Sequence, residues 1–327
     1  MRGQVARLLL CLVILASCLP AGAQADESVR VAVLKFGTVN WELDTVQAHG
    51  LDRANGIALE MLPLAGKSAT SVSLQAGAVD MMVTDWVWVA RQRAAGMAVS
   101  FLPYSTALGA VMVPSDSPVT SLADLAGRKL GVAGGPLDKS WLLLQALARR
   151  QDGLDLATAA EPVFGAPPLL NEQLIDGRLD AVVTFWPYAA RLEARGYRRL
   201  LGVADILQAL GFARDLPLVG YVFDERWAQE HPGRIEGFVE ATAAARRLMA
   251  GSDAEWQRLR PLMQAEDDAV FRALRDGFRA GIPGPWGKAE QAEAARLFEL
   301  LRRIGGPPLV GTAEHLPEGT FWQGSSN

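Results

Sequence analysis

Cysteine is almost absent from this 327-residue sequence, which contains two such residues, Cys11 and Cys18, both near the N-terminus. A leader that is cleaved after Ala25 would carry both of them away. The remaining chain would then have no disulfide, no thiol nucleophile and no cysteine-based metal site. We therefore expect no cysteine chemistry in the mature protein.

Histidine is nearly as scarce, and the familiar catalytic motifs are missing. The three histidines, His49, His231 and His315, are too far apart in sequence for the short spacings of metal-binding motifs. The sequence contains no Gly-x-Ser-x-Gly elbow, no Ser-x-x-Lys pair and no His-Glu-x-x-His helix motif. These absences disfavour hydrolase and metalloenzyme chemistry, so we expect no catalytic residues, no metal and no cofactor.

Charge of one sign is not concentrated anywhere either. The chain has 32 basic and 36 acidic side chains, and its lysines and arginines are scattered. A nucleic-acid-binding surface needs a basic patch, so nucleic acid is excluded as a partner.

After the N-terminal region no apolar run approaches the roughly 18 residues of a membrane-spanning helix, and we expect a soluble mature protein. With 50% hydrophobic and 21% charged residues, the chain is long enough for two lobes with separate apolar cores.

The N-terminal segment has the features of a secretory signal peptide. Two arginines, Arg2 and Arg7, precede an apolar run at residues 8–19, and small residues follow it up to Ala25. We expect residues 1–25 to be removed by cleavage near Ala25 and the protein to be located in the periplasm. An alternative stays open, because residues 15–18 (LASC) resemble a lipobox, which would make the protein a membrane-anchored lipoprotein through Cys18.

Beyond the leader, short β-branched segments alternate with helical patterns, which indicates βα units and parallel sheets. The region from about residue 226 to 304 has helical periodicity throughout. The expected strands are residues 29–34, 58–64, 78–83, 109–113, 129–133, 161–164, 179–184 and 217–223.

This order of elements predicts an α/β fold with two lobes. We expect residues 28–113 and 221–327 to form the first lobe and residues 114–220 to form the second. The chain would cross between the lobes at the turn-rich residues 114–118 and again near Pro217. In open parallel sheets, ligands bind in the cleft at the carboxyl ends of the strands, and candidate site residues are expected there.

A sequence unit is repeated one hundred positions apart. Residues 74–97 and 174–197 are identical at ten of 24 positions without a gap, where composition alone gives roughly two. In each copy a helix ends at a glycine, an aspartate marks the turn, and a buried strand leads into a Thr-x-Trp motif. The repeat therefore indicates two structurally equivalent walls of one cleft.

The two Thr-x-Trp motifs supply the first candidate ligand contacts. They comprise Thr84, Asp85 and Trp86 in the first copy and Thr184, Phe185 and Trp186 in the second. We expect both tryptophans to contact the ligand, because both follow a strand end at the cleft. The Asp85 carboxylate either pairs with a cationic group of the ligand or caps the following helix. Because Phe185 stands at the equivalent position, we expect this difference to determine specificity.

Three other segments offer polar groups to the expected cleft. A Gly-Gly-Pro turn before a helix would direct free backbone N–H groups at an anion, unless it is an ordinary strand-to-helix turn. The candidates there are Gly135, Asp138, Lys139 and Ser140. The second segment is a helix start, which is alternatively an exposed helix cap. The third is the loop after the first strand, which is alternatively a packed loop. Their candidates are Lys67 and Ser68 in the helix start, and Thr38, Asn40 and Trp41 in the loop.

Several strings resemble the substrate-binding proteins of ABC importers for nitrate, sulfonate and taurine, a class that includes thiamine-pyrimidine binders. They are residues 74–80 (LQAGAVD), 111–118 (VMVPSDSP), 121–132 (SLADLAGRKLGV) and 226–232 (RWAQEHP). The likeness covers about two thirds of the chain, from residue 29 to 249. It implies a type II periplasmic-binding-protein fold, in which two βα lobes with mixed sheets are joined by a two-strand hinge.

The resemblance implies a function in transport. We expect a monomeric solute-binding component of an ABC transporter, which captures a small organic solute and delivers it to permease and ATPase subunits. The solute would be sulfonate- or taurine-like, or a polar heteroaromatic such as a thiamine pyrimidine precursor. Aromatic residues such as Trp86, Trp88 and Tyr188 disfavour a small inorganic anion. The alternatives are an accessory periplasmic protein that binds a partner enzyme or peptide, and an enzyme acting on a pyrimidine precursor.

Overall fold

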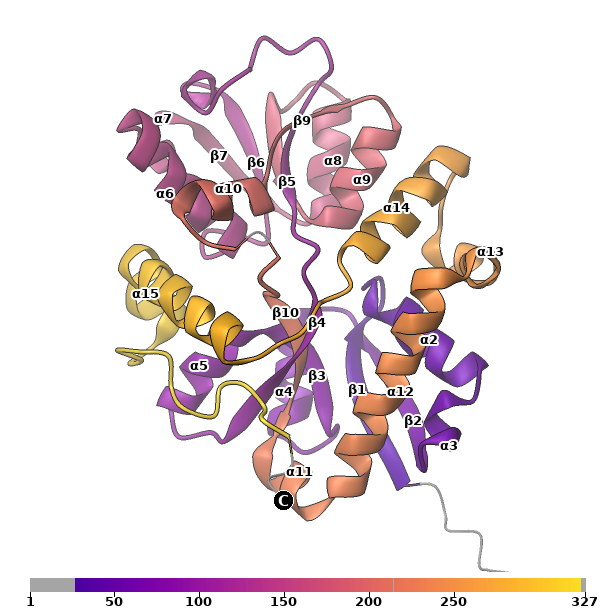
Figure 1. Cartoon of the computed structure of the whole chain (residues 1–327). Helices are drawn as coiled ribbons and strands as arrows, with labels where there is room; N and C mark the ends of the chain where they lie inside the picture. The colour runs from indigo at the N-terminus through magenta and orange to yellow at the C-terminus, as the bar shows by residue number, and fades with distance from the viewer. Residues whose placement is uncertain (1–26, 214, 325–327) are drawn as a thin grey trace, which may run out of the picture.

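Figure 1 shows a computed structural model of the chain, which describes residues 27–213 and 215–324. The predicted signal peptide and Cys18 lie outside the described residues. The chain forms two lobes, each built on a five-stranded mixed sheet with helices packed against it. The predicted α/β class with two mixed sheets is therefore confirmed. Among the described residues, none of the helices has both the length and the apolarity that crossing a bilayer requires.

The first sheet has the strand order β2-β1-β3-β10-β4. Its strands are β1 (Glu27–Leu34), β2 (Ile57–Leu64), β3 (Met81–Asp85), β4 (Val99–Ser105) and β10 (Val219–Asp224). Strand β1 pairs in parallel with β2 and β3, whereas β10 runs antiparallel to β3 and β4. The consecutive residues Val31, Ala32 and Val33 of β1 are all buried, as expected for a central strand that is covered on both faces.

The second sheet repeats this arrangement with the order β7-β6-β8-β5-β9. Its strands are β5 (Ala110–Val113), β6 (Lys129–Ala133), β7 (Glu161–Gly165), β8 (Ala181–Thr184) and β9 (Arg198–Gly202). Strand β6 pairs in parallel with β7 and β8, and β5 is inserted antiparallel between β8 and β9. The equivalent strands β3 and β8 are those that end in the two Thr-x-Trp motifs.

The first crossing between the sheets comes earlier than the sequence predicted. Strand β5 pairs with β8 and β9, so it belongs to the second sheet, and the predicted boundary after residue 113 is wrong. The chain crosses at residues 106–109 instead. The turn-rich residues 114–118 form a local turn, in which the Ser117 N–H donates to the Pro114 carbonyl. The return strand β10 begins at Val219, slightly before the expected boundary at residue 221.

Helices connect the strands in both lobes (Figure 1). In the first lobe they are α2 (Val39–Ala48), α3 (Leu51–Ala54), α4 (Lys67–Gln75) and α5 (Trp86–Ala94). In the second lobe they are α6 (Lys139–Asp152), α7 (Leu156–Ala159), α8 (Pro167–Ile175), α9 (Trp186–Ala194), α10 (Val203–Leu210) and the short 3₁₀ helix Ala123–Leu125. Asp85 and Asp138 are the N-cap residues of helices α5 and α6, and their carboxylates accept backbone N–H groups of the first turn.

The C-terminal helices pack against both lobes. They are α11 (Glu225–Glu230), α12 (Pro232–Gly251), α13 (Asp253–Met263), α14 (Asp268–Ala280) and α15 (Lys288–Val310). Helix α12 lies along α2 of the first lobe, and α14 reaches across to α9 of the second lobe, as Figure 1 shows. Helix α15 contacts α5 in one lobe and α6 in the other. The two lobes are therefore bridged by these helices as well as by the crossing segments.

Candidate functional site

Two pockets lie between the lobes, and each has walls from both. We name them the Asp85 pocket, with a volume of about 460 Å³, and the Trp41 pocket, with a volume of about 410 Å³. The Asp85 pocket is lined by the start of α4, the β3–α5 junction, the loop before α6 and the end of α15. The Trp41 pocket is lined by the loop after β1, by α8 and α9, and by the connection between α13 and α14.

An ion pair crosses the Asp85 pocket from one lobe to the other. Asp85 Oδ2 lies 2.6 Å from the Lys139 ammonium nitrogen, and the two side chains are 12% and 20% exposed. The other carboxylate oxygen of Asp85, Oδ1, accepts the Trp88 N–H at 3.0 Å. Both roles considered for Asp85, a charge partner and a helix cap, are thus present, but the charge partner is a lysine of the chain itself.

The surroundings keep both members of this pair charged. Burial alone would raise the pKa of Asp85, but the ammonium groups of Lys139 and Lys67 outweigh it, so the pKa lies below its usual value. Burial would likewise lower the pKa of Lys139, and the Asp85 carboxylate more than offsets that effect, which leaves the pKa raised. The pocket therefore contains a desolvated carboxylate and a desolvated ammonium group that satisfy each other.

At the start of α6, at least one of the free N–H groups that the Gly-Gly-Pro turn suggested is taken by a side chain of the chain itself. The Asp138 carboxylate accepts the Ser140 N–H at 2.9 Å, so this helix end is capped from within the chain. Burial raises the pKa of Asp138 in spite of the nearby ammonium groups of Lys139 and Lys67. Of the two glycines in the turn, Gly134 lines the pocket and Gly135 does not.

Of the remaining predicted residues near the Asp85 pocket, some line its wall and others are buried in the protein interior. Lys67 and Ser68 line the Asp85 pocket together with Thr84. The Lys67 ammonium lies 5.5 Å from the centre of the Phe185 ring, a cation–π contact between the lobes. Thr184 is buried, and its hydroxyl has no hydrogen-bond partner among the described residues.

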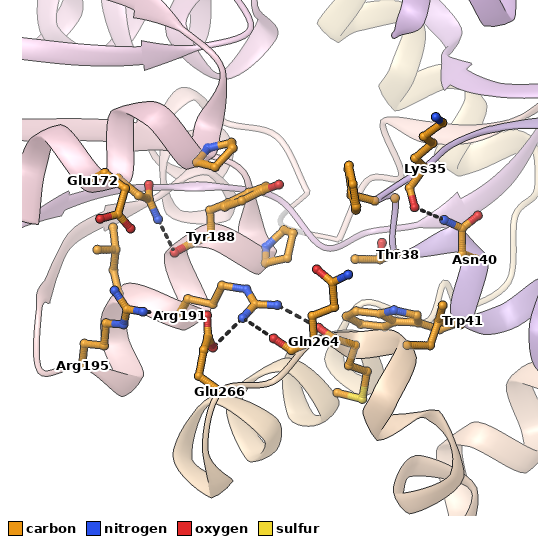
Figure 2. Close-up of a pocket in the computed structure, with 18 of the residues that line it drawn as sticks. Lys35, Thr38, Asn40, Trp41, Glu172, Tyr188, Arg191, Arg195, Gln264 and Glu266 are labelled. Carbon is orange, nitrogen blue, oxygen red and sulfur yellow. Dashed lines mark hydrogen bonds and ion pairs between the residues drawn. The ribbon is translucent and has the colours of Figure 1, made fainter. Parts of the chain in front are cut away.

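The Trp41 pocket contains the predicted residues of the first loop. In Figure 2, Thr38, Asn40 and Trp41 stand on one side of the cavity and Tyr188 and Arg191 on the other. The Asn40 amide donates to the carbonyls of Leu34 and Lys35, so it holds the loop in shape. The Trp41 ring is 5% exposed. The predicted site residues are therefore split between two pockets instead of converging on one.

Comparison with known proteins identifies the family. The model of the NMT1/THI5-like family matches residues 46–254, which is more than half of the chain. The chain belongs to the NMT1/THI5-like family. This assignment confirms the resemblance to nitrate-, sulfonate- and taurine-binding proteins that the sequence motifs carried. A search of curated protein sequences gave no match.

Solved structures show how far the NMT1/THI5-like fold is shared. The periplasmic aliphatic sulphonate binding protein SsuA from Escherichia coli is 19% identical, with coverage of 92% of this chain and 94% of that one and a TM-score of 0.74. The alkanesulfonate-binding protein SsuA from Xanthomonas axonopodis pv. citri, bound to MOPS, is 20% identical, with coverage of 88% and 97% and a TM-score of 0.65. The desulfurization enzyme DSZB is 17% identical, with coverage of 85% and 92% and a TM-score of 0.57. At these identities the likeness shows the fold.

Neither of the two repeat tryptophans lines a pocket of this NMT1/THI5-like protein. The prediction that Trp86 contacts a ligand is wrong because its ring is fully buried, whereas a ligand contact of the half-buried Trp186 stays a prediction. Trp86 is fully buried, and its indole N–H donates to the Pro217 carbonyl at 3.0 Å. Trp186 packs edge-on against Trp41 with ring centres 6.1 Å apart. Large aromatic side chains gain most from burial, and C-terminal segments distant in sequence cover both rings.

Two arginines that occupy equivalent positions in the repeat were assigned no role by the sequence patterns. Arg91 lines the Asp85 pocket and donates to the Pro308 carbonyl of α15 at 3.3 Å. Arg191 lines the Trp41 pocket and donates to the carbonyls of Met263 and Gln264 at 2.8 and 3.0 Å. The signal that could have identified them is their identity in both copies of the repeat.

Proposed function

We propose that this protein is the periplasmic solute-binding component of an ABC importer, and that it holds a small charged organic solute in the Asp85 pocket. The observation that carries the proposal is the Asp85–Lys139 ion pair, which joins the two lobes at 2.6 Å inside the cleft. A carboxylate and an ammonium group that are both withdrawn from water need a charged partner. A solute that enters between the lobes has to supply those partners.

The charges of the pocket favour a zwitterionic solute. An anionic group of the solute would replace the Asp85 carboxylate beside Lys139 and Lys67, and a cationic group would replace Lys139 beside Asp85. Taurine and related aminosulfonates carry both charges at a short separation. The Xanthomonas relative is bound to MOPS, which combines a sulfonate with a basic morpholine nitrogen.

A polar heteroaromatic solute has weaker support. A pyrimidine would need an aromatic face to stack on, and neither Trp86 nor Trp186 lines a pocket. The Asp85 pocket does have an aromatic lining residue, Trp88. The buried ion pair between Asp85 and Lys139 nevertheless favours a solute with charges of both signs, so the sulfonate or taurine-like class is the one we propose.

Binding is tested by thermal shift and native mass spectrometry of the purified mature protein. We expect taurine to raise the melting temperature, and nitrate, thiamine pyrimidine and ethanolamine to have smaller effects. A ligand at 100 times its Kd stabilises a folded protein by about 2.7 kcal/mol, which such assays detect readily. No stabilisation by any sulfonate would contradict the proposed function.

Paired variants assign the effect to the pocket. In Lys139→Met we expect the taurine-induced shift to disappear, because the ammonium group that receives the sulfonate is lost. Lys129→Met is the matched control, since Lys129 is exposed at the start of β6 in the same lobe. An equal loss in both variants would argue against a site at Lys139. Delivery to a transporter is tested by whether permease and ATPase genes adjoin this gene and whether their deletion abolishes taurine uptake.

A further inference from the structure

The Asp85 pocket and the Trp41 pocket are built from equivalent parts of the two lobes. The Asp85 pocket lies between α4 and α5 of the first lobe and the loop after β6 of the second. The Trp41 pocket lies between α8 and α9 of the second lobe and the loop after β1 of the first. Helices α8 and α9 begin one hundred residues after α4 and α5, and β1 and β6 occupy the same place in their sheets. Exchanging the lobes therefore exchanges the pockets.

Individual lining residues follow the same offset. Six positions that line the Asp85 pocket recur one hundred residues later in the wall of the Trp41 pocket. They are Ser68 and Pro168, Ser71 and Asn171, Val72 and Glu172, Val87 and Pro187, Trp88 and Tyr188, and Arg91 and Arg191. The internal repeat thus forms two cavities on one plan. The Trp41 pocket, with a volume of about 410 Å³, is within the size range of small-molecule sites.

The two pockets differ in charge. The walls of the Asp85 pocket carry the ion pair between Asp85 and Lys139. Phe185 stands at the position equivalent to Asp85. Val39 is the first residue of α2, as Lys139 is the first residue of α6. Among the described residues, the Trp41 pocket therefore has no counterpart of this ion pair, and it suits a different class of ligand.

Asn171 on α8 gives the Trp41 pocket a polar group that needs a partner. Asn171 lines the pocket and is 6% exposed. Its amide nitrogen donates to the Tyr188 carbonyl at 3.0 Å, and this bond fixes the orientation of the amide group. The amide oxygen, Oδ1, has no hydrogen-bond partner among the described residues. A buried acceptor without a donor is costly, so this wall favours a ligand that brings an N–H group.

Five charged side chains line the Trp41 pocket, and three of them face one another. Arg191 pairs with Glu266 at 2.6 Å, and Arg195 approaches the same carboxylate to 3.7 Å. The other two, Lys35 and Glu172, are exposed, and Figure 2 shows them on opposite sides of the cavity. Water solvates exposed charges well, so each of these two adds little to affinity. Their opposite signs nevertheless match the two ends of a zwitterion.

Exposed apolar side chains belong to the same cavity. Phe36 in the loop after β1 is 76% exposed, and Leu262 near the end of α13 is 42% exposed. Both line the Trp41 pocket. Contact of large apolar groups with water is unfavourable, so an apolar side chain of a ligand would gain by covering them.

We propose that the Trp41 pocket is a second binding site, and that it takes a short peptide of about two or three residues with an apolar side chain. A peptide N–H donates to Asn171 Oδ1. The terminal ammonium group lies towards Glu172 and the terminal carboxylate towards Lys35. The apolar side chain covers Phe36 and Leu262. The inference goes beyond the proposed function and does not depend on it, because it concerns other residues and another class of ligand.

Calorimetric titration with the dipeptide glycyl-leucine tests the site. We expect a single molecule to bind per chain, both in the free protein and in protein saturated with taurine. The matched ligand is the ester analogue, in which an oxygen replaces the amide N–H. We expect it to bind at least about tenfold more weakly, because it has no donor for Asn171 Oδ1. Displacement of glycyl-leucine by taurine, or equal affinity for the ester, would overturn the inference.

Variants assign the peptide to its pocket. Asn171→Leu removes the acceptor, and we expect it to lower the affinity for glycyl-leucine at least about tenfold and to keep taurine binding. Asn55→Leu is the matched control, because the Asn55 amide also donates to a carbonyl, that of Leu51 at 2.7 Å, and lies outside both pockets. Lys139→Met should have the opposite effect on the two ligands. Equal losses of peptide affinity in Asn171→Leu and Asn55→Leu would argue against the site.

The outcomes separate this site from the proposed function. If glycyl-leucine binds and no sulfonate does, the second site stands and the proposed function is contradicted. If taurine binds and glycyl-leucine does not, the inference is overturned and the proposed function stands. If neither binds, both are contradicted. Should Asn171→Leu fail to fold, the comparison of glycyl-leucine with its ester on the unaltered protein still decides.

Discussion

Arg91 and Arg191 occupy equivalent positions in the internal repeat, and each connects its own lobe to a C-terminal helix through a hydrogen bond. Arg91 donates to the Pro308 carbonyl at 3.3 Å, and Arg191 donates to the Met263 carbonyl at 2.8 Å. The last carbonyls of a helix have no partner within the helix, so a guanidinium group there satisfies them. The repeat thus builds attachment points for the C-terminal helices as well as the cleft walls.

The Arg191 contact is expected to contribute measurably to stability. Arg191→Met removes two hydrogen bonds to helix carbonyls and an ion pair of 2.6 Å with Glu266. We expect it to lower the free energy of unfolding by about 2 kcal/mol, measured by urea denaturation. Arg195→Met is the control, because Arg195 approaches Glu266 only to 3.7 Å near the surface and should cost less than 1 kcal/mol. Equal effects would contradict the proposed anchoring role.

Trp86 is expected to behave as a core residue. Its ring is fully buried, with its centre 6.1 Å from that of Phe321 near the C-terminus. We expect Trp86→Ala to destabilise the protein by about 3–5 kcal/mol, as other large-to-small core substitutions do. Trp88→Ala, at the half-buried neighbouring position, should cost less. Near-native stability of Trp86→Ala in thermal unfolding would show that this assignment to the core is wrong.

Gly277 on α14 allows the close packing of α14 against α9. A Cβ atom at this position would lie 2.8 Å from Cζ3 of Trp186. We expect Gly277→Val to lower the free energy of unfolding by about 1–3 kcal/mol through overpacking. In the double variant with Trp186→Leu the loss should be less than additive, because the two changes compensate at one contact. Gly233→Ala in α12, where a Cβ atom meets nothing within 4 Å, is the control.

Stability is expected to fall at acidic pH partly through Glu255. Burial opposes ionisation of this carboxyl, but hydrogen bonds from Arg258, Thr45 and His49 outweigh it and lower its pKa from 4.5 to about 2. The folded form therefore binds this proton less readily than the unfolded form. The contribution, about 2 kcal/mol, is present above pH 4.5 and is lost as the pH falls towards 2. Urea denaturation from pH 7 to 3 should show a shallower decline in Glu255→Gln than in the unaltered protein.

The sequence predicted the sheets better than the site, for physical reasons. β-Branched strands such as β1 and the repeated Thr-x-Trp units reflect local preferences and burial, which a sequence pattern records. The membership of the four-residue strand β5 depends on its partners β8 and β9, which local composition does not show. Likewise the Lys139 partner of Asp85 lies 54 positions away in the other lobe. Pro308, which lines the Asp85 pocket, belongs to α15. The sequence of this segment indicates a helix but does not show that the helix reaches the pocket.

In the proposed function, the solute is held between Asp85 and Lys139. Calorimetric titration of taurine into the unaltered protein, Asp85→Asn, Lys139→Met and the double variant tests this directly. We predict that each single change lowers the affinity at least about tenfold, and that the double variant loses clearly less than the sum, because both residues act on one bound molecule. If folded Asp85→Asn and Lys139→Met bind taurine as tightly as the unaltered protein does, the claim is contradicted.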